Sequence, residues 1–269
     1  MLLVLIPSGL LTLLTLATMV TFLVKRDTPI VKLANRTMTT IQLISHLSLF
    51  VLPNIPIFIA KTSTTCMLGQ IFLGMAFSLT LSINISKSQK LYMIVTSKIR
   101  MSNAEILITK ASEWIIILAA LIINASLNTL SFINDKVTVK QQYFDQTSTK
   151  EWYCSNSIMI YIQLFIAAVL SLCNGLQGFR ARKLPSRFQE TNHVIYSSFI
   201  SSVVFVAATA SYFSQRSMIN RSFIILFVSV VYNMTHFLLL YGYKLFIVLF
   251  RPQLNTKESV NKKRLERIG

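Results

Sequence analysis

The sequence predicts an all-α membrane protein, a bundle of seven transmembrane helices, and three observations support this fold class. Hydrophobic residues make up 53% of the 269 residues and charged residues only 13%, whereas an ordinary soluble domain carries about 25% charged residues. Apolar runs of about 20 residues, the length of a membrane-spanning helix, recur along the chain with short polar breaks between them. The basic residues are concentrated in every second polar segment between these apolar runs.

The apolar runs divide the chain into seven predicted helices, at about 2–24, 38–60, 67–89, 112–133, 156–177, 194–214 and 222–249. Together they form one domain, residues 1–250, followed by a basic tail, residues 251–269. Helices are favoured over strands because a membrane barrel would show alternating segments of about ten residues. The first run lacks the basic leader and the small-residue cleavage site of a signal peptide, so it is predicted to span. Pro53 and Pro56 are expected to kink the second helix.

The distribution of charge predicts the topology. If residue 1 lies outside, 20 of the 26 lysines and arginines fall in inner loops and the tail. Cationic loops are retained on the cytoplasmic side, so the N-terminus is predicted outside and the C-terminus in the cytoplasm. The net charge of +17 is therefore a topology signal with some attraction to anionic membrane lipid. No soluble basic module is present, so no nucleic-acid partner is predicted.

The three cysteines fall at distinct positions. Cys66 opens the third helix and Cys154 precedes the fifth, both on the outer side, where disulfides form. A bridge between them would tether the second outer loop to the third helix, and two unpaired thiols are the alternative. Cys173, in the middle of the fifth helix, is predicted to be a small buried apolar residue.

Ionisable residues within apolar runs are costly, which makes them candidates for function. Lys87 lies near the inner end of the third helix and Glu190 at the inner start of the sixth. They could pair across the cytoplasmic mouth of the bundle, or each could extend separately to the lipid headgroups. His46 and His236 have no ligand-spaced partner and are predicted to be hydrogen-bonded interior imidazoles, so no metal site is expected.

Motifs typical of enzymes do not occur in the sequence. There is no glycine-rich phosphate loop, HExxH, GxSxG or pair of intramembrane carboxylates. The chain is therefore predicted not to be an enzyme and to need no cofactor. A transporter or channel would be expected to show paired or inverted repeats, which are also absent from the sequence.

Several loops resemble those of one receptor family. The stretch DTPIVKLANR, residues 27–36, resembles the first intracellular loop of class C G-protein-coupled receptors, and EWYCSNS, residues 151–157, resembles the cysteine region of their second outer loop. FRARKLPSRFQE, residues 179–190, is similar to their third inner loop. KLFIVLFRPQLNT, residues 244–256, is similar to the end of their seventh helix. The matches occur in the family's order over nearly the whole chain.

The resemblance implies a receptor of the plasma membrane that passes a ligand-induced conformational change to a heterotrimeric G protein. It implies a Lys87–Glu190 contact that locks the inactive state and a Cys66–Cys154 disulfide. The residues expected to face the G protein are Lys32, Arg36, Arg182, Lys183 and Lys244. It also implies receptor homo- or heterodimers.

In the family, a large extracellular domain binds the small-molecule ligand, which is amino-acid-like or chemosensory, and this sequence opens directly on its first helix. Two explanations follow: the chain is a fragment of a longer receptor, or it is a compact seven-helix receptor. The alternative function is a non-signalling truncated receptor or membrane scaffold that modulates a full-length partner.

Overall fold

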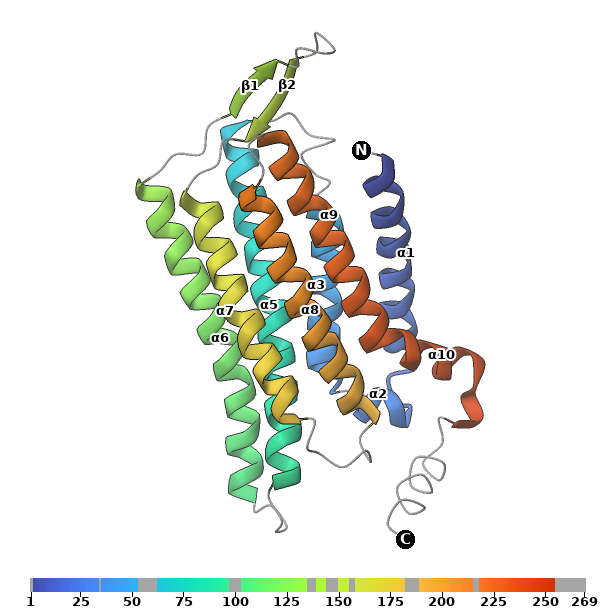
Figure 1. Cartoon of the computed structure of the whole chain (residues 1–269). Coiled ribbons are helices and arrows are strands. Elements are labelled where there is room, and N and C mark those ends of the chain that lie inside the picture. The colour runs from blue at the N-terminus through green and yellow to red at the C-terminus, as the bar shows by residue number, and fades with distance from the viewer. Residues whose placement is uncertain are drawn as a thin grey trace.

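A computed structural model describes residues 2–33, 35–52, 62–96, 103–134, 139–143, 150–154, 158–181, 189–214 and 218–254. Within these residues the chain is a bundle of long helices that run roughly along one axis (Figure 1). The N-terminus and a small hairpin lie at one end of the bundle. The short helix α2 lies at the opposite end, which is called the α2 end below.

The described residues contain seven long helical segments, each of which overlaps one predicted run. Six of these are α1 (Leu2–Val24), α3 (Arg36–Val51), α5 (Ser63–Thr96), α6 (Asn103–Asn134), α7 (Ile158–Ala181) and α8 (Gln189–Ser214). The seventh is continuous through α9 (Met218–Phe237), the π-helix η2 (Leu238–Gly242) and α10 (Tyr243–Phe250). The two short elements are α2 (Pro29–Leu33) and η3 (Pro252–Leu254). The predicted seven-helix bundle is confirmed.

Among the described residues, four helical stretches are long and apolar enough to cross a membrane. They are Ile6–Val24, Ser63–Lys90, Ala111–Leu130 and Ser229–Phe250, and shorter apolar stretches occur at Tyr161–Gln177 and Ser202–Ser214. The described part of helix α3 has only 16 residues, and its buried face carries several polar side chains, which bond to neighbouring helices. The predicted kink at Pro53 and Pro56 lies outside the described residues.

Helices α5 and α6 continue past the apolar runs that predicted them. Helix α5 has 34 residues and α6 has 32, so at 1.5 Å per residue each is about 50 Å long. This exceeds the hydrocarbon thickness of about 30 Å. Both helices extend furthest at the α2 end, where Figure 1 shows them projecting beyond their neighbours. Charged residues of these helices therefore lie near the α2 end.

A β-hairpin, which the sequence analysis did not predict, adds to the helical fold. Strand β1 (Val139–Tyr143) pairs antiparallel with β2 (Lys150–Cys154), and Val139 lies opposite Cys154. The strands include Tyr143 and Trp152, aromatic residues that favour strands. The hairpin covers the end of the bundle opposite the α2 end (Figure 1).

The outer surface of the bundle is apolar and much of its interior is polar. Leu13, Ile122 and Phe199 are 65%, 63% and 66% exposed, although they are large hydrophobic residues. This arrangement is the reverse of that in soluble proteins. It is expected of helices surrounded by lipid, where polar side chains bond between helices. The prediction that Cys173 is buried is wrong, because its thiol is exposed on α7. A small apolar side chain is equally compatible with lipid and with the core.

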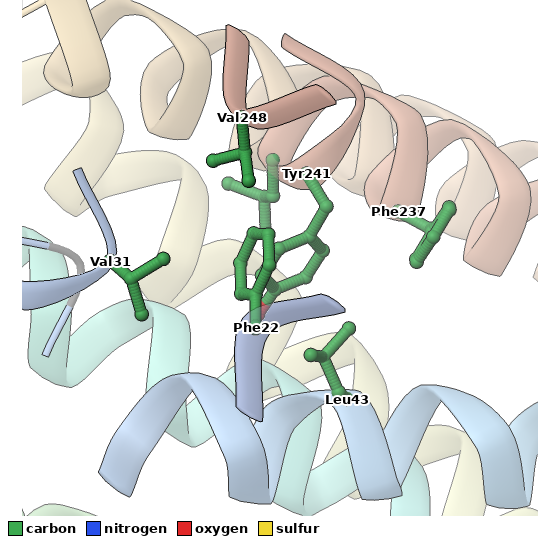
Figure 2. Packing of buried hydrophobic residues seen from close by; sticks show 7 residues of the cluster. Phe22, Val31, Leu43, Phe237, Tyr241 and Val248 are labelled. Carbon is green, nitrogen blue, oxygen red and sulfur yellow. The ribbon is translucent and has the colours of Figure 1, made fainter. Parts of the chain in front are cut away.

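A hydrophobic cluster closes the bundle towards the α2 end. It joins Phe22 of α1, Val31 of α2, Leu43 of α3, and Tyr241 and Val248 of the last helix (Figure 2). The rings of Phe22 and Tyr241 meet edge to face with centroids 6.1 Å apart, a favourable arrangement for aromatic pairs. Because Val31 is only 3% exposed, this cluster anchors the loop that carries the DTPIVK sequence.

Candidate functional site

Gln42 links three helical segments around the candidate lock lysine. Its side chain is fully buried on α3, and its Oε1 accepts hydrogen bonds from Lys87 Nζ at 2.7 Å and from Tyr241 OH at 2.8 Å. Its Nε2 donates to Asn84 Oδ1 at 2.7 Å. The amide thus uses both ends to connect α3 with α5 and with η2. Lys87 is held inside the bundle instead of lying free at its surface.

Two buried histidines extend this arrangement towards the middle of the bundle. His236 Nδ1 lies 3.3 Å from His46 Nε2, and its other ring nitrogen contacts the amide of Asn84. His46 Nδ1 contacts Asn233, whose Nδ2 donates to the backbone oxygen of His46 at 2.9 Å. The prediction of hydrogen-bonded interior imidazoles is confirmed. The seven residues Gln42, His46, Asn84, Lys87, Asn233, His236 and Tyr241 are called the central polar network.

The π-helical turn η2 carries one member of this network. A π-turn inserts an extra residue into a helix and is frequent at functional sites. Residues Leu238–Gly242 adopt it between α9 and α10, and Tyr241 within the turn is 1% exposed. The turn brings the hydroxyl of Tyr241 to Gln42 and its ring to Phe22. Sequence patterns predicted one continuous apolar helix here, because hydrophobicity does not reveal a local change in hydrogen-bond spacing.

The predicted partner of Lys87 is only partly described. Glu190 is the second residue of α8, and its side chain lies outside the described residues. One turn further along α8, the ring of His193 stacks on Tyr243 of α10, with centroids 5.3 Å apart and planes at 25°. The first turns of α8 therefore lie beside α10 at the α2 end. The Lys87–Glu190 contact stays a prediction.

The loop between α1 and α3 forms an exposed ion cluster around Asp27. Arg36 Nη2 lies 2.9 Å from Asp27 Oδ1, and Lys32 Nζ lies 3.4 Å from the same oxygen. The hydrogen bond from Lys32, together with the charges of Lys32 and Arg36, holds the pKa of Asp27 below its ordinary value. A carboxylate with a lowered pKa stabilises this arrangement at neutral pH and loses that effect only as the pH falls through the lowered pKa. Asp27 is therefore a carboxylate at physiological pH, the form that pairs with Lys32 and Arg36.

Glu113 forms a buried ion pair that the sequence analysis did not predict. Glu113 is 5% exposed on α6, and its Oε1 lies 2.5 Å from Lys90 Nζ on α5. Its Oε2 accepts from Asn35 Nδ2 at 3.3 Å, and its backbone oxygen accepts from Ser86 Oγ at 3.3 Å. A single carboxylate at the edge of an apolar run was the signal in the sequence. Its partners could not be read there because they lie on other helices.

A cavity of about 520 Å³ lies between the Asp27 loop, α5 and α6 at the α2 end. Lys32, Asn35, Arg36, Thr37, Met38, Lys90, Glu113 and Trp114 line it. Two of the residues predicted to face a G protein, Lys32 and Arg36, therefore border a hollow in the protein surface. Arg182 and Lys183 lie outside the described residues, and Lys244 lies partly buried on α10.

The predicted disulfide cysteines lie towards the hairpin end of the bundle. Cys66, in the first turn of α5, is buried and disulfide-bonded. Cys154 ends strand β2, and its side chain lies outside the described residues. Cys173 is a free thiol. The pairing of Cys66 with Cys154 stays a prediction.

Comparisons with known proteins identify the family. A family model described as "7 transmembrane sweet-taste receptor of 3 GCPR" matches residues 1–243. A metabotropic glutamate receptor of Drosophila melanogaster is 21% identical over 248 residues, which cover 91% of this chain and 25% of that receptor. The extracellular calcium-sensing receptor of Homo sapiens is 24% identical over 249 residues, covering 89% of this chain and 22% of that receptor. The chain thus spans about a quarter of the length of these relatives. It belongs to the seven-transmembrane, class C family of G-protein-coupled receptors.

Proposed function

We propose that the chain is a class C transmembrane signalling domain that passes a ligand-induced conformational change to a heterotrimeric G protein. The observation that carries this proposal is the position of Lys87, which joins α3, α5 and η2 through Gln42 at the α2 end. In the proposed function, Lys87 keeps its hydrogen bond to Gln42 while its other contacts change. Such a contact suits a switch between two states.

The proposed orientation puts the α2 end in the cytoplasm of a cell whose plasma membrane the bundle spans. The excess of basic residues in the loops at this end supports it, because such loops remain inside. The hairpin would then face the cell exterior, where a Cys66–Cys154 disulfide would tether it to α5. The three cysteines, the oxidised state of Cys66 and the free thiol of Cys173 support this pairing.

In the proposed mechanism, Lys87 bridges to Glu190 in the inactive state, and in the active state this bridge is broken while the hydrogen bond to Gln42 remains. A bound ligand acts by having higher affinity for one of the two states. Loss of the bridge frees the first turn of α8 from α5, which opens the α2 end to the G protein. Lys32, Arg36, Arg182, Lys183 and Lys244 would then contact it.

Charge reversal at Glu190 tests the lock. Glu190→Lys should raise basal G-protein activation several-fold in cells that express the chain, after correction for the amount at the cell surface. The exchange Lys87→Glu with Glu190→Lys should restore low basal activity, because the opposite charges face each other again. Glu258→Lys, the same reversal in the tail, is the matched control and should change basal activity little.

Unchanged basal activity in Glu190→Lys at normal surface expression would show that the lock is wrong. If no variant activates a G protein but the chain suppresses a co-expressed full-length relative, the alternative function as a non-signalling modulator is supported instead. The first outcome would contradict only the Lys87–Glu190 lock. The second would contradict the proposed signalling function as a whole.

A further inference from the structure

The cavity at the α2 end is separate from the central polar network. It is bordered by α2, the start of α3 and the facing parts of α5 and α6. Its volume of about 520 Å³ lies within the range of about 300 to 1,000 Å³ that holds small ligands. The proposed lock does not use this volume, whereas Lys32 and Arg36, two of the proposed G-protein contacts, border it.

The side chains around the cavity favour an anion. Three cationic side chains line it, and the one carboxylate among the lining residues, Glu113, is already paired with Lys90. Lys32 and Arg36 have side chains 50% and 42% exposed, so both remain accessible although each contacts Asp27. An ammonium carries three donors and a guanidinium five. Both side chains therefore keep donors for a second anionic partner.

The start of α3 adds to the positive potential. Asn35 precedes the helix with a left-handed backbone, φ 56°, and its side chain does not cap the first turn. Its amide instead donates to Glu113. Residues Arg36, Thr37 and Met38 of this first turn line the cavity. The positive end of the helix dipole thus faces the same space as the basic side chains.

The cavity also borders the surface of the bundle that faces lipid. Trp114 lines it and is 40% exposed, and Leu118, one turn further along the same face of α6, is 52% exposed. Tryptophan favours the boundary between headgroups and hydrocarbon. An occupant could therefore place its polar part in the cavity and its acyl chains along α6.

We propose that this cavity binds the phosphorylated headgroup of an anionic lipid of the cytoplasmic leaflet, of the phosphoinositide class. Basic pockets between transmembrane helices at that leaflet suit such headgroups. The phosphates contact Lys32, Arg36 and the first turn of α3, while the Lys90–Glu113 pair forms the floor. The proposal rests on the orientation proposed above, and the bound lipid would hold the Asp27 loop against α5 and α6.

Binding can be measured on the full chain, purified in neutral detergent at physiological salt. Short-chain phosphatidylinositol bisphosphate should bind, phosphatidylcholine of the same chain length should not, and soluble inositol trisphosphate should compete for the site. The double variant Lys32→Gln, Arg36→Gln should weaken binding of the bisphosphate lipid by about 30-fold, the effect expected of two basic contacts near a membrane surface. Native mass spectrometry or a fluorescent lipid provides the readout.

The matched control removes the same charge from other exposed arginines near the α2 end. Arg180→Gln with Arg251→Gln should weaken binding less than about threefold, since neither residue lines the cavity and salt screens exposed charges outside the site. Equal loss in both double variants, or equal binding of the two lipids, would overturn the site. Thr37→Glu gives a third arm, because it adds a negative charge to the lining and should also abolish binding. No G protein takes part, so a failure here leaves the receptor proposal untouched.

Discussion

Single side chains in this bundle derive their importance from where their partners lie. Gln42 is one uncharged residue in a predicted span, yet its amide joins Lys87, Tyr241 and Asn84. A buried amide that loses its partners costs about 1 to 3 kcal/mol. The residue that positions the candidate lock lysine is therefore neutral, and a search for charged residues would pass over it.

The Lys90–Glu113 pair gives a prediction at this scale. Lys90→Met leaves Glu113 buried without its counter-ion and should destabilise the bundle by about 3 to 5 kcal/mol. Glu113→Gln should cost less, because Lys90 keeps 30% of its side-chain surface exposed and can extend to water. Replacing both residues together should destabilise the bundle much less than the sum of the two single substitutions. Thermal unfolding in detergent measures all three.

The exposed Lys25 offers the control for this cycle. Lys25→Met removes a lysine from the same end of the bundle and should change stability by no more than about 0.5 kcal/mol. Additive effects of the two substitutions at Lys90 and Glu113 would mean that the ion pair contributes nothing of its own.

At the scale of helices, small residues decide where two helices can approach. The Asn124, Asn128 and Gln163 side chains bond to one another between α6 and α7, and Asn124 also donates to Ser78 of α5. Gly74 of α5 makes room for this group. A Cβ atom at Gly74 would lie 1.6 Å from Gln163 Oε1, so any larger residue there displaces the amide.

Gly74→Ala should therefore destabilise the bundle, because Gln163 must turn away from its amide partners. The expected loss is about 1 to 3 kcal/mol. Gly69→Ala, on the same helix with nothing within 4 Å of the new Cβ, should be neutral or stabilise by up to about 1 kcal/mol. In a Gln163→Ala background the substitution at Gly74 should cost almost nothing. A similar loss in that background would show that the close approach is not the cause.

At the scale of the whole molecule, orientation in the membrane is the property that every functional proposal needs. We expect a cysteine introduced at Thr147, between the two strands, to react with an impermeant maleimide on intact cells. Lys25→Cys should react only after the cells are permeabilised. Both variants belong in a Cys173→Ala background, which removes the free thiol on α7. The opposite labelling pattern would reverse the proposed topology.

Much of the fold could be predicted from the sequence, and the errors have a common cause. The runs that predicted the helices are local features, and so are the loop motifs of the family. The burial of Cys173 was predicted wrongly and the role of Glu113 was missed, because each depends on what faces the residue. Within a helix surrounded by lipid, hydrophobicity does not distinguish the core from the outside.

The sequence by itself determined that seven apolar helices cross a membrane and that this chain belongs to the class C receptors. Those conclusions follow from segment length, charge distribution and contiguous motifs, all of which are properties of residues that are close together in the sequence. Only the tertiary structure decided that Gln42 holds Lys87, that Lys90 neutralises Glu113, and that the first loop borders a basic cavity. Each of these joins residues from different helices, and such contacts exist only once the helices have packed.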